Sequence, residues 1–166
     1  MGAKWTTVTD KLTSIEATLR SMKGRRVKVG ALRGSHAWLA GIHEYGCDIA
    51  VTPKMRAFLH SQGLHLKPST TVIKIPERSF LRSGFDENND RILKQTERAI
   101  CMVIDGQMSA DDLFDLFGQQ MATAIKNKIR DLDDPANHPF TVDQKGSSNP
   151  LVDTGGMIES ITWEKD

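Results

Sequence analysis

The chain contains little cysteine, almost no excess of charge and no long hydrophobic run. With only two cysteines, Cys47 and Cys101, a disulfide framework is excluded and a reducing compartment is the simplest expectation. The formal net charge is +1, so the chain has no overall basic field of the kind that attracts nucleic acid. No apolar segment approaches the length of a membrane span or of a signal-peptide core. We therefore expect no membrane partner.

What the sequence does contain is typical of one globular domain over 1–166. Hydrophobic residues make up 39% of the chain, which is enough apolar material for a real core. Hydrophobic periodicity predicts an α+β fold, in which a small, mostly antiparallel sheet packs against long helices. The expected helices lie near 8–23, 35–45, 53–60, 79–102 and 109–132, and the expected strands near 26–32, 48–51, 70–75 and 161–164. We expect a strand-helix-strand excursion near 47–74 and an ordered polar loop at 133–150.

Small polar residues and glycines mark the expected ends of these helices. The expected N-terminal caps are Thr9 or Asp10, Ser35, and Ser109 with Asp112 as a capping box. The expected stops and interruptions are Gly24, Gly46 and Gly84. Because only a short Asp-Gly turn joins the two long helices, we expect them to pack antiparallel.

The sharpest metal-like pattern is His43-Glu44-x-x-Cys47. It is similar to a zinc-protease motif in which the second histidine has become cysteine, and such a site needs both ligands on one unbroken helix. Gly46 indicates that the helix ends before Cys47. We therefore expect no metal and no cofactor; instead His43 and Glu44 should make polar contacts while Tyr45 packs.

Two charged clusters leave alternatives open. One is acidic and could bind a cation, although at a helix C-terminus it is more simply a solvated helix end: Asp131, Asp133 and Asp134. The other is basic and could contact nucleic acid, although it more simply lines the solvated face of a strand: Lys23, Arg25, Arg26 and Lys28. A nucleic-acid-binding module is therefore the first alternative function, and the near-zero net charge disfavours it.

Residues 145–163 combine turn chemistry with a short amphipathic element that could also pass into a strand. Asp153 and Thr154 offer side-chain oxygens for a helix cap. The local pattern Leu-Val-Asp-Thr-Gly also matches an aspartic protease. Only 13 residues follow Asp153, and the chain has no second Asp-Thr/Ser-Gly. We therefore expect Asp153 to be catalytically silent and the protein not to be an enzyme, with a small hydrolase as the second alternative.

Three blocks of the sequence together resemble a known family. Residues 145–161 resemble the C-terminal signature of bacteriophage tail-completion (neck, virion-morphogenesis) proteins, Lys-Gly-x-x-x-Pro-Leu-hydrophobic-Asp-Thr-Gly-x-hydrophobic-x-x-Ser-Ile. His43-Glu44-Tyr45-Gly46 resembles the family's His/Tyr-Glu-aromatic-Gly element. Residues 75–82 resemble its Ile-Pro-x-Arg-Pro/Ser-Phe-Leu-Arg element. The blocks stand in the family's order and span most of the chain.

The resemblance implies a structural virion protein at the phage neck, which completes the tail and enables head–tail joining. It implies a homo-oligomeric ring, hexameric or dodecameric, assembled in the bacterial host cytoplasm, with the tail terminator or tail tube and the head–tail connector as neighbours. DNA would pass through the ring without specific recognition. Residues 47–74 are longer than in compact members of the family, and we expect them to form an arm to a neighbouring subunit.

The resemblance also points to residues with structural or assembly roles, and Phe80 and Leu81 among them are expected to anchor the core. These residues are His43, Glu44, Tyr45, Gly46, Pro76, Arg78, Phe80, Leu81, Arg82, Pro150, Leu151, Asp153, Thr154, Gly155 and Ser160.

Overall fold

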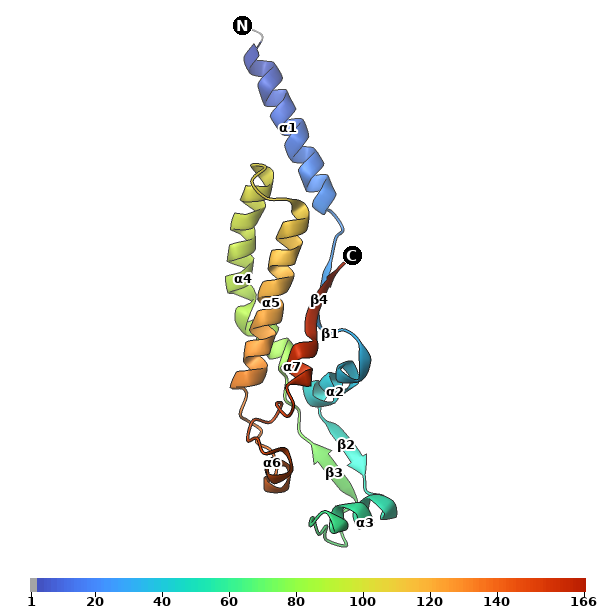
Figure 1. Cartoon of the computed structure of the whole chain (residues 1–166). Coiled ribbons are helices and arrows are strands. Elements are labelled where there is room, and N and C mark those ends of the chain that lie inside the picture. The colour runs from blue at the N-terminus through green and yellow to red at the C-terminus, as the bar shows by residue number, and fades with distance from the viewer. Residues whose placement is uncertain (1–2) are drawn as a thin grey trace.

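The computed structural model describes residues 3–166, with side chains from residue 10 onward, and shows an elongated molecule (Figure 1). Its helices are α1 (Ala3–Met22), α2 (Gly34–Tyr45), α3 (Pro53–Ser61), α4 (Leu81–Ile104), α5 (Ala110–Asp131), α6 (Pro139–Lys145) and α7 (Gly156–Ser160). Its strands are β1 (Val27–Ala31), β2 (Cys47–Ala50), β3 (Val72–Ile75) and β4 (Ile161–Lys165). The predicted α+β class, with short antiparallel strands packed against helices, is confirmed.

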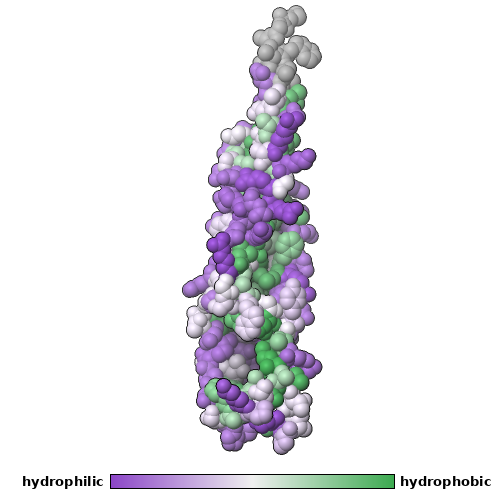
Figure 2. Space-filling model, turned by 90° about the vertical axis from the view of Figure 1, so that its right-hand side faces the viewer, coloured by the Kyte–Doolittle hydropathy of each residue, from purple (hydrophilic) through white to green (hydrophobic). Residues whose placement is uncertain are grey.

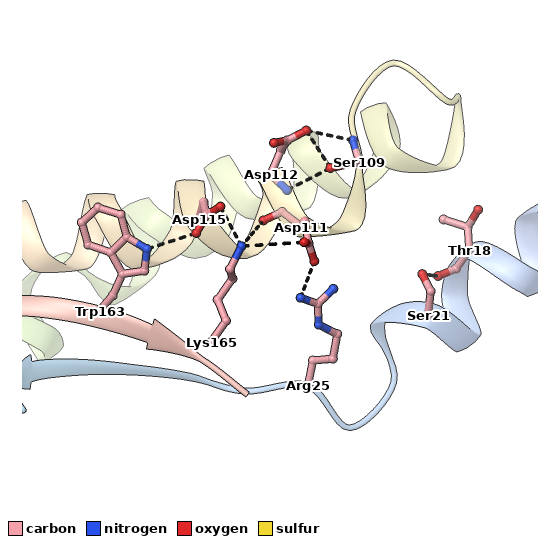
Figure 3. Close-up of polar contacts among 9 residues, drawn as sticks. All are labelled: Thr18, Ser21, Arg25, Ser109, Asp111, Asp112, Asp115, Trp163 and Lys165. Carbon is pink, nitrogen blue, oxygen red and sulfur yellow. Dashed lines mark hydrogen bonds and ion pairs between the residues drawn. The ribbon is translucent and has the colours of Figure 1, made fainter.

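The long helices α4 and α5 form the antiparallel hairpin predicted from their short connecting turn (Figure 1). The capping box at the start of α5 is present: the Ser109 hydroxyl accepts from the Asp112 N–H at 3.1 Å, and the Asp112 carboxylate accepts from the Ser109 N–H at 3.4 Å (Figure 3). The expected interruption at Gly84 is wrong, because α4 runs unbroken through it. A Cβ at Gly84 would come within 3.3 Å of the Ile125 backbone, so this glycine allows the two helices to approach closely.

The strands form two separate two-stranded sheets rather than the single sheet expected. β1 pairs with β4 in a register that places Val29 opposite Trp163, and this sheet packs on α5. β2 pairs with β3, with Ile49 opposite Ile73. This second hairpin lies with α3 at the end of the molecule opposite α1 (Figure 1). The predicted strand-helix-strand excursion at 47–74 is confirmed, but its strands lie too far from β1 and β4 to join their sheet.

Strand β4 is held on α5 by close packing and by polar contacts. The Trp163 side chain lies against Gly118, where an added Cβ would come within 2.5 Å of the ring. Trp163 Nε1 donates to the Asp115 carboxylate at 3.2 Å, and Lys165 Nζ donates to it at 2.7 Å (Figure 3). The bond from Lys165, followed by that from Trp163, lowers the pKa of Asp115. The C-terminal strand is therefore an integral part of the fold.

One apolar cluster joins the helical hairpin to the β1–β4 sheet. Its largest fully buried apolar side chains are Phe80, Ile92, Met121, Ile129 and Ile161. Because Phe80 is 0% exposed and Leu81 packs against the same cluster, the prediction that these two residues anchor the core is confirmed. A second, smaller cluster nearer the α4–α5 turn consists of Ala99, Val103 and Leu113. None of the helices in residues 3–166 has the length and hydropathy needed to cross a bilayer.

Several expected helix ends differ from the structure. α1 already begins at Ala3, so Thr9 and Asp10 lie inside it and do not cap it. α2 begins after Arg33, whose side chain makes no cap, and Ser35 lies within the helix. The capping preference of these residues is therefore not used at either helix start.

The polar segment 133–150 is ordered as expected, but it contains the short helix α6. Pro139 occupies the first position of this helix, where its missing N–H does no harm. His138 caps the helix by accepting a hydrogen bond from the Phe140 N–H at 3.2 Å. A histidine cap is a weak sequence signal, and that is why this helix was not predicted.

Candidate functional site

The three sequence blocks lie far apart in the chain but close together in the structure. The end of α2 carries the first block, 43–46, and the segment that leads into α4 carries the second, 75–82. The third block, 145–161, runs from the end of α6 to the first residue of β4. The first two blocks share a network of hydrogen bonds. The second block binds the segment 135–137, which in turn contacts the third. We refer to the contacts between Glu44 and residues 79–82 as the Glu44 junction.

The Glu44 side chain, at the end of α2, closes the first turn of α4. It is 1% exposed. One carboxylate oxygen accepts from the N–H groups of Phe80 and Leu81 at 2.9 and 2.8 Å. The other accepts from the Arg82 N–H at 3.0 Å and from the Ser79 hydroxyl at 2.9 Å. Because Phe80, at the N-cap position, has no side-chain cap, a residue from another helix satisfies the N–H groups that a helix start leaves free.

The electrostatics of the Glu44 junction favour an ionised carboxylate. Burial raises the pKa of Glu44, but hydrogen bonds from the backbone of Leu81 and Arg82, then from the side chains of Arg82 and Ser79, outweigh burial. The pKa therefore lies below its ordinary value of 4.5. The positive end of the α4 dipole also favours a negative charge at this place. Glu44 is consequently a charged cap at neutral pH.

Arg82 covers the Glu44 junction on its solvent side. Its Nε donates to the Glu44 carboxylate at 2.9 Å, and one Nη donates to the Glu44 carbonyl oxygen at 3.0 Å. The same Nη donates to the Glu77 carboxylate at 2.6 Å. The guanidinium also lies over the Tyr45 ring, 5.0 Å from its centroid. The expectation that Tyr45 packs is wrong, because its side chain is 68% exposed on the outer face of α2.

Gly46 allows the first and second blocks to approach each other closely. Its φ of 72° lies in the region that favours glycine, and an added Cβ would lie 2.9 Å from both the Glu77 nitrogen and the Ile75 carbonyl oxygen. The prediction that Gly46 ends the helix is confirmed, and Cys47 already belongs to β2. Pro76 directly follows β3, where its missing N–H ends the ladder.

Arg78 fastens the segment after α5 to the same region. Its side chain is 4% exposed, although it is charged. Nε donates to the Pro135 carbonyl at 2.7 Å. One Nη donates to the Ala136 carbonyl and to Asn137 Oδ1, each at 3.2 Å. Since a guanidinium presents several donors in a fixed fork, one side chain holds three consecutive residues that belong to no helix or strand. The Arg78 N–H itself donates to the His43 carbonyl at 2.7 Å.

In the third block, the polar contacts are made chiefly by Asn149 and Lys145. Lys145 opens the signature, but the sequence assigned a role to neither residue. Asn149 Nδ2 donates to carbonyls at the end of α5, at 2.9 Å to Arg130 and 3.3 Å to Ile129. Its Oδ1 accepts from the Leu151 N–H at 2.8 Å. Lys145 Nζ donates to the Asn149 carbonyl at 3.1 Å. The one available sequence signal was an asparagine before a proline, which is typical of a turn.

The apolar part of the third block packs into the core. Pro150 and Leu151 are both buried, and Leu151 belongs to the main apolar cluster. Ser160 ends α7 and donates to the Met157 carbonyl at 2.7 Å. The sequence of this stretch allowed a short helix or a strand. The structure has both in succession, α7 and then β4.

The expected cap by Asp153 is wrong. Asp153 is exposed, and α7 starts after Gly155 without a side-chain cap. Gly155 has a φ of 86°, so the turn is made by backbone conformation rather than by a capping carboxylate. The Thr154 hydroxyl lies 3.5 Å from the Gly156 nitrogen, the limiting distance for a hydrogen bond.

A surface cavity of about 580 Å³ opens beside the Glu44 junction. His43, Arg78, Asn137, Phe140 and Thr141 are among the residues that line it. The Nδ1 atom of His43 is buried without a hydrogen-bond partner among the described residues. Burial, followed by the charges of Arg78 and Lys145, lowers the pKa of His43 below its ordinary value of 6.5. The imidazole is therefore neutral at pH 7.

The other residues considered from the sequence lie apart from the Glu44 junction. Across residues 3–166 there is no group of three or more potential metal ligands, and the acidic residues 131, 133 and 134 are exposed. In the basic cluster, Arg25 pairs with Asp111 at 2.5 Å (Figure 3) and lies 4.5 Å from the Phe114 ring centroid. Lys28 pairs with Asp166 at 3.0 Å. Two of its four cations are thus engaged in intramolecular ion pairs.

The Glu44 junction and its neighbours form a buried polar network that holds α2, the start of α4 and the segment 135–137 in one arrangement. It organises the surface around Tyr45, Arg82 and the cavity beside His43. Comparison of the chain with protein-family models, with curated proteins and with solved structures gives no match.

Proposed function

We propose that this protein is a structural component of a bacteriophage neck, where a homo-oligomeric ring of it completes the tail and enables the tail to join the DNA-filled head. The observation that carries the proposal is that the first two blocks meet at Glu44, while Arg78 of the second block binds the segment 135–137, which contacts the third block at Asn149. Three short patterns that matched the tail-completion signature by chance would have no reason to be linked by one series of hydrogen bonds. Their contacts support the interpretation that they belong to one structural unit.

The exposed surface suits assembly into a ring. Each sheet has only two strands, so each ladder leaves open edges within the described residues, and open edges favour pairing with another chain. Trp38 and Tyr45 lie seven residues apart on α2 and are 70% and 68% exposed. Large aromatic side chains in such positions are typical of binding surfaces. On the face shown in Figure 2, hydrophobic surface is exposed over the middle and lower parts of the molecule.

The β2–α3–β3 excursion is proposed to be the arm that reaches a neighbouring subunit. It stands at one end of the molecule (Figure 1) and is held together from within. Arg56 donates to the carbonyls of Leu66, Lys67 and Thr70, at 3.1, 2.9 and 2.6 Å. Phe58, on α3, is 61% exposed. A unit that is ordered by its own hydrogen bonds and presents an aromatic side chain is suited to contact another chain.

The proposed ring has hexameric or dodecameric symmetry and lies in the virion between the head–tail connector and the tail terminator or tube. DNA passes through it without sequence-specific contacts. The role is structural and involves no catalysis and no cofactor.

Genetic complementation tests the proposal. In a phage that lacks this protein, infectivity should be restored by the wild-type chain and by Asp153→Asn, because Asp153 is exposed and outside the network. It should not be restored by a variant in which residues 51–71 are replaced by Asn-Gly. This variant keeps β2 and β3 as a hairpin, since Ala50 and Val72 face each other and Asn-Gly favours a two-residue turn. Normal infectivity of the phage without any copy of the chain would overturn the proposal.

A further inference from the structure

Helix α1 carries a heptad pattern of apolar residues. Leu12, Ile15, Leu19 and Met22 are separated by three, four and three residues. In the sequence, Trp5 and Val8 extend the same alternation toward the N-terminus. The remaining positions of residues 3–23 are polar or alanine. Apolar residues that repeat as positions a and d of a heptad form the seam of a coiled coil.

The position of α1 leaves part of this seam exposed, most of all at Leu12. α1 projects from the end of the body formed by α4 and α5 (Figure 1). Met22, at the base, packs against the small cluster of Ala99, Val103 and Leu113. Farther out, Leu19 is 47% exposed and Leu12 is 62% exposed. Most helical stability in proteins comes from packing of the apolar face, so an unpacked seam leaves α1 without that stabilisation.

The charges beside the seam select the partner and its direction. With Leu12 at position a, Lys11 lies at g and Glu16 at e. In a parallel, in-register pair, Lys11 of each helix faces Glu16 of the other, and the two contacts attract. In an antiparallel pair, g faces g and e faces e, so Lys11 of one helix does not face Glu16 of the other and this attraction is lost. Glu16 remains available, because its present partner Arg20 is on the same exposed surface and both side chains are solvated.

We propose that α1 is a self-association segment, whose seam packs in parallel against the α1 helices of other copies of this chain. Leucine at a with isoleucine at d, as in Leu12 and Ile15, favours bundles of more than two helices. The bundle therefore holds more than two copies. This contact requires only further copies of the chain, so it is independent of the proposed place at a phage neck.

Disulfide trapping in the full-length chain tests the proposal. Cys47 and Cys101 are first replaced by serine, so that no native thiol contributes. Leu12→Cys then places a thiol in the seam, and Ala17→Cys places one at position f on the opposite, exposed side of the same helix. In a glutathione redox buffer, Leu12→Cys should form covalent dimers at several times the yield of Ala17→Cys. Equal yields would overturn the proposal.

A mixing experiment checks the direction of the helices. The parallel arrangement predicts that Leu12→Cys links to itself more readily than to an Ile15→Cys chain, because a faces a in parallel pairs and d in antiparallel ones. Preferential linking of Leu12→Cys to Ile15→Cys would contradict the parallel arrangement.

Sedimentation equilibrium supplies the number of copies. The wild-type chain and Ala17→Glu should associate to a mass of more than two chains as concentration rises, whereas Leu12→Glu should stay monomeric. Because Leu12 is 62% exposed, Leu12→Glu should keep the melting temperature of the body, which separates loss of association from loss of folding. Association of Leu12→Glu equal to that of the wild type would overturn the proposal.

Discussion

Glu44 and Arg82 form an ion pair with 2.9 Å between a carboxylate oxygen and Nε, and this pair joins the last turn of α2 to the first turn of α4. The two residues differ in burial, since Glu44 is 1% exposed at its side chain and Arg82 51%. The buried Glu44 carboxylate therefore depends on hydrogen bonds within the protein, whereas the exposed Arg82 guanidinium can form hydrogen bonds with water instead. This difference in burial predicts that substitutions at Glu44 destabilise the fold more than substitutions at its exposed partners.

Glu44→Gln should lower the free energy of unfolding by about 3 kcal/mol or more. The hydrogen bonds to the charged carboxylate are stronger than those to a neutral amide, and the glutamine NH2 group would point one of its donors at backbone N–H groups, which are donors themselves. Urea denaturation measures the change. Glu77→Gln is the matched control: Glu77 pairs with the same arginine but is 55% exposed, so its loss should change the free energy of unfolding by less than about 1 kcal/mol. Equal losses in the two variants would contradict the assigned role of Glu44.

The stability of the fold should fall as the pH falls, in two separate windows. The pKa of His43 is lower in the folded state than its ordinary value of 6.5, so below pH 6.5 the unfolded chain binds more protons and stability declines. The pKa of Glu44 is also depressed, so its contribution is present above pH 4.5 and is lost as the pH falls through the folded-state pKa.

Unfolding free energies measured from pH 7 downward check the sign of both effects. His43→Gln should flatten the first decline while Glu44→Gln should flatten the second. A stability that rises as the pH falls below 6.5 would contradict the buried, neutral state of His43.

Phe80→Ala should destabilise the fold by about 3–5 kcal/mol, because the side chain is 0% exposed and its removal leaves a cavity in the main cluster. Phe85→Ala is a control in the same helix with the same chemistry. Phe85 is 43% exposed, so its replacement should cost clearly less. Equal melting temperatures of the two variants would show that Phe80 is not a core anchor.

Gly118→Ala should destabilise the fold by roughly 1–3 kcal/mol, because the new methyl group would overlap the Trp163 side chain. Gly41→Ala makes the same chemical change in α2 where nothing lies within 4 Å of the new Cβ. There the gain in helix propensity should stabilise by about 0.5–1 kcal/mol. Opposite signs in chemical denaturation are expected, and a stabilising Gly118→Ala would contradict the packing of β4 on α5.

Much of the secondary structure could be predicted because its signals are local. Ser109 and Asp112 cap α5 across three residues, Pro53 starts α3, and Gly46 ends α2. Each of these depends on the chemistry of one turn of chain, which a sequence displays directly. The amphipathic periodicity of the long helices is a signal of the same kind.

The features that could not be predicted depend on tertiary neighbours. Glu44 caps a helix that begins 37 residues later, and no local pattern reveals such a partner. Gly84 looks like an interruption, but it is required for the close approach of α5. The alternation of apolar and polar residues along each strand is the same whether the strands form one sheet or two. Tyr45 has an apolar ring, yet the register of α2 places Glu44 inward and Tyr45 outward.

The proposal that this chain joins phage heads to tails is tested most directly by electron microscopy of a lysate. When a phage that lacks the chain is grown on its host, the account predicts DNA-filled heads and complete but separate tails, with joined particles restored by supplying the wild-type chain. A lysate without the chain in which heads and tails are joined as in the parent phage would contradict the account.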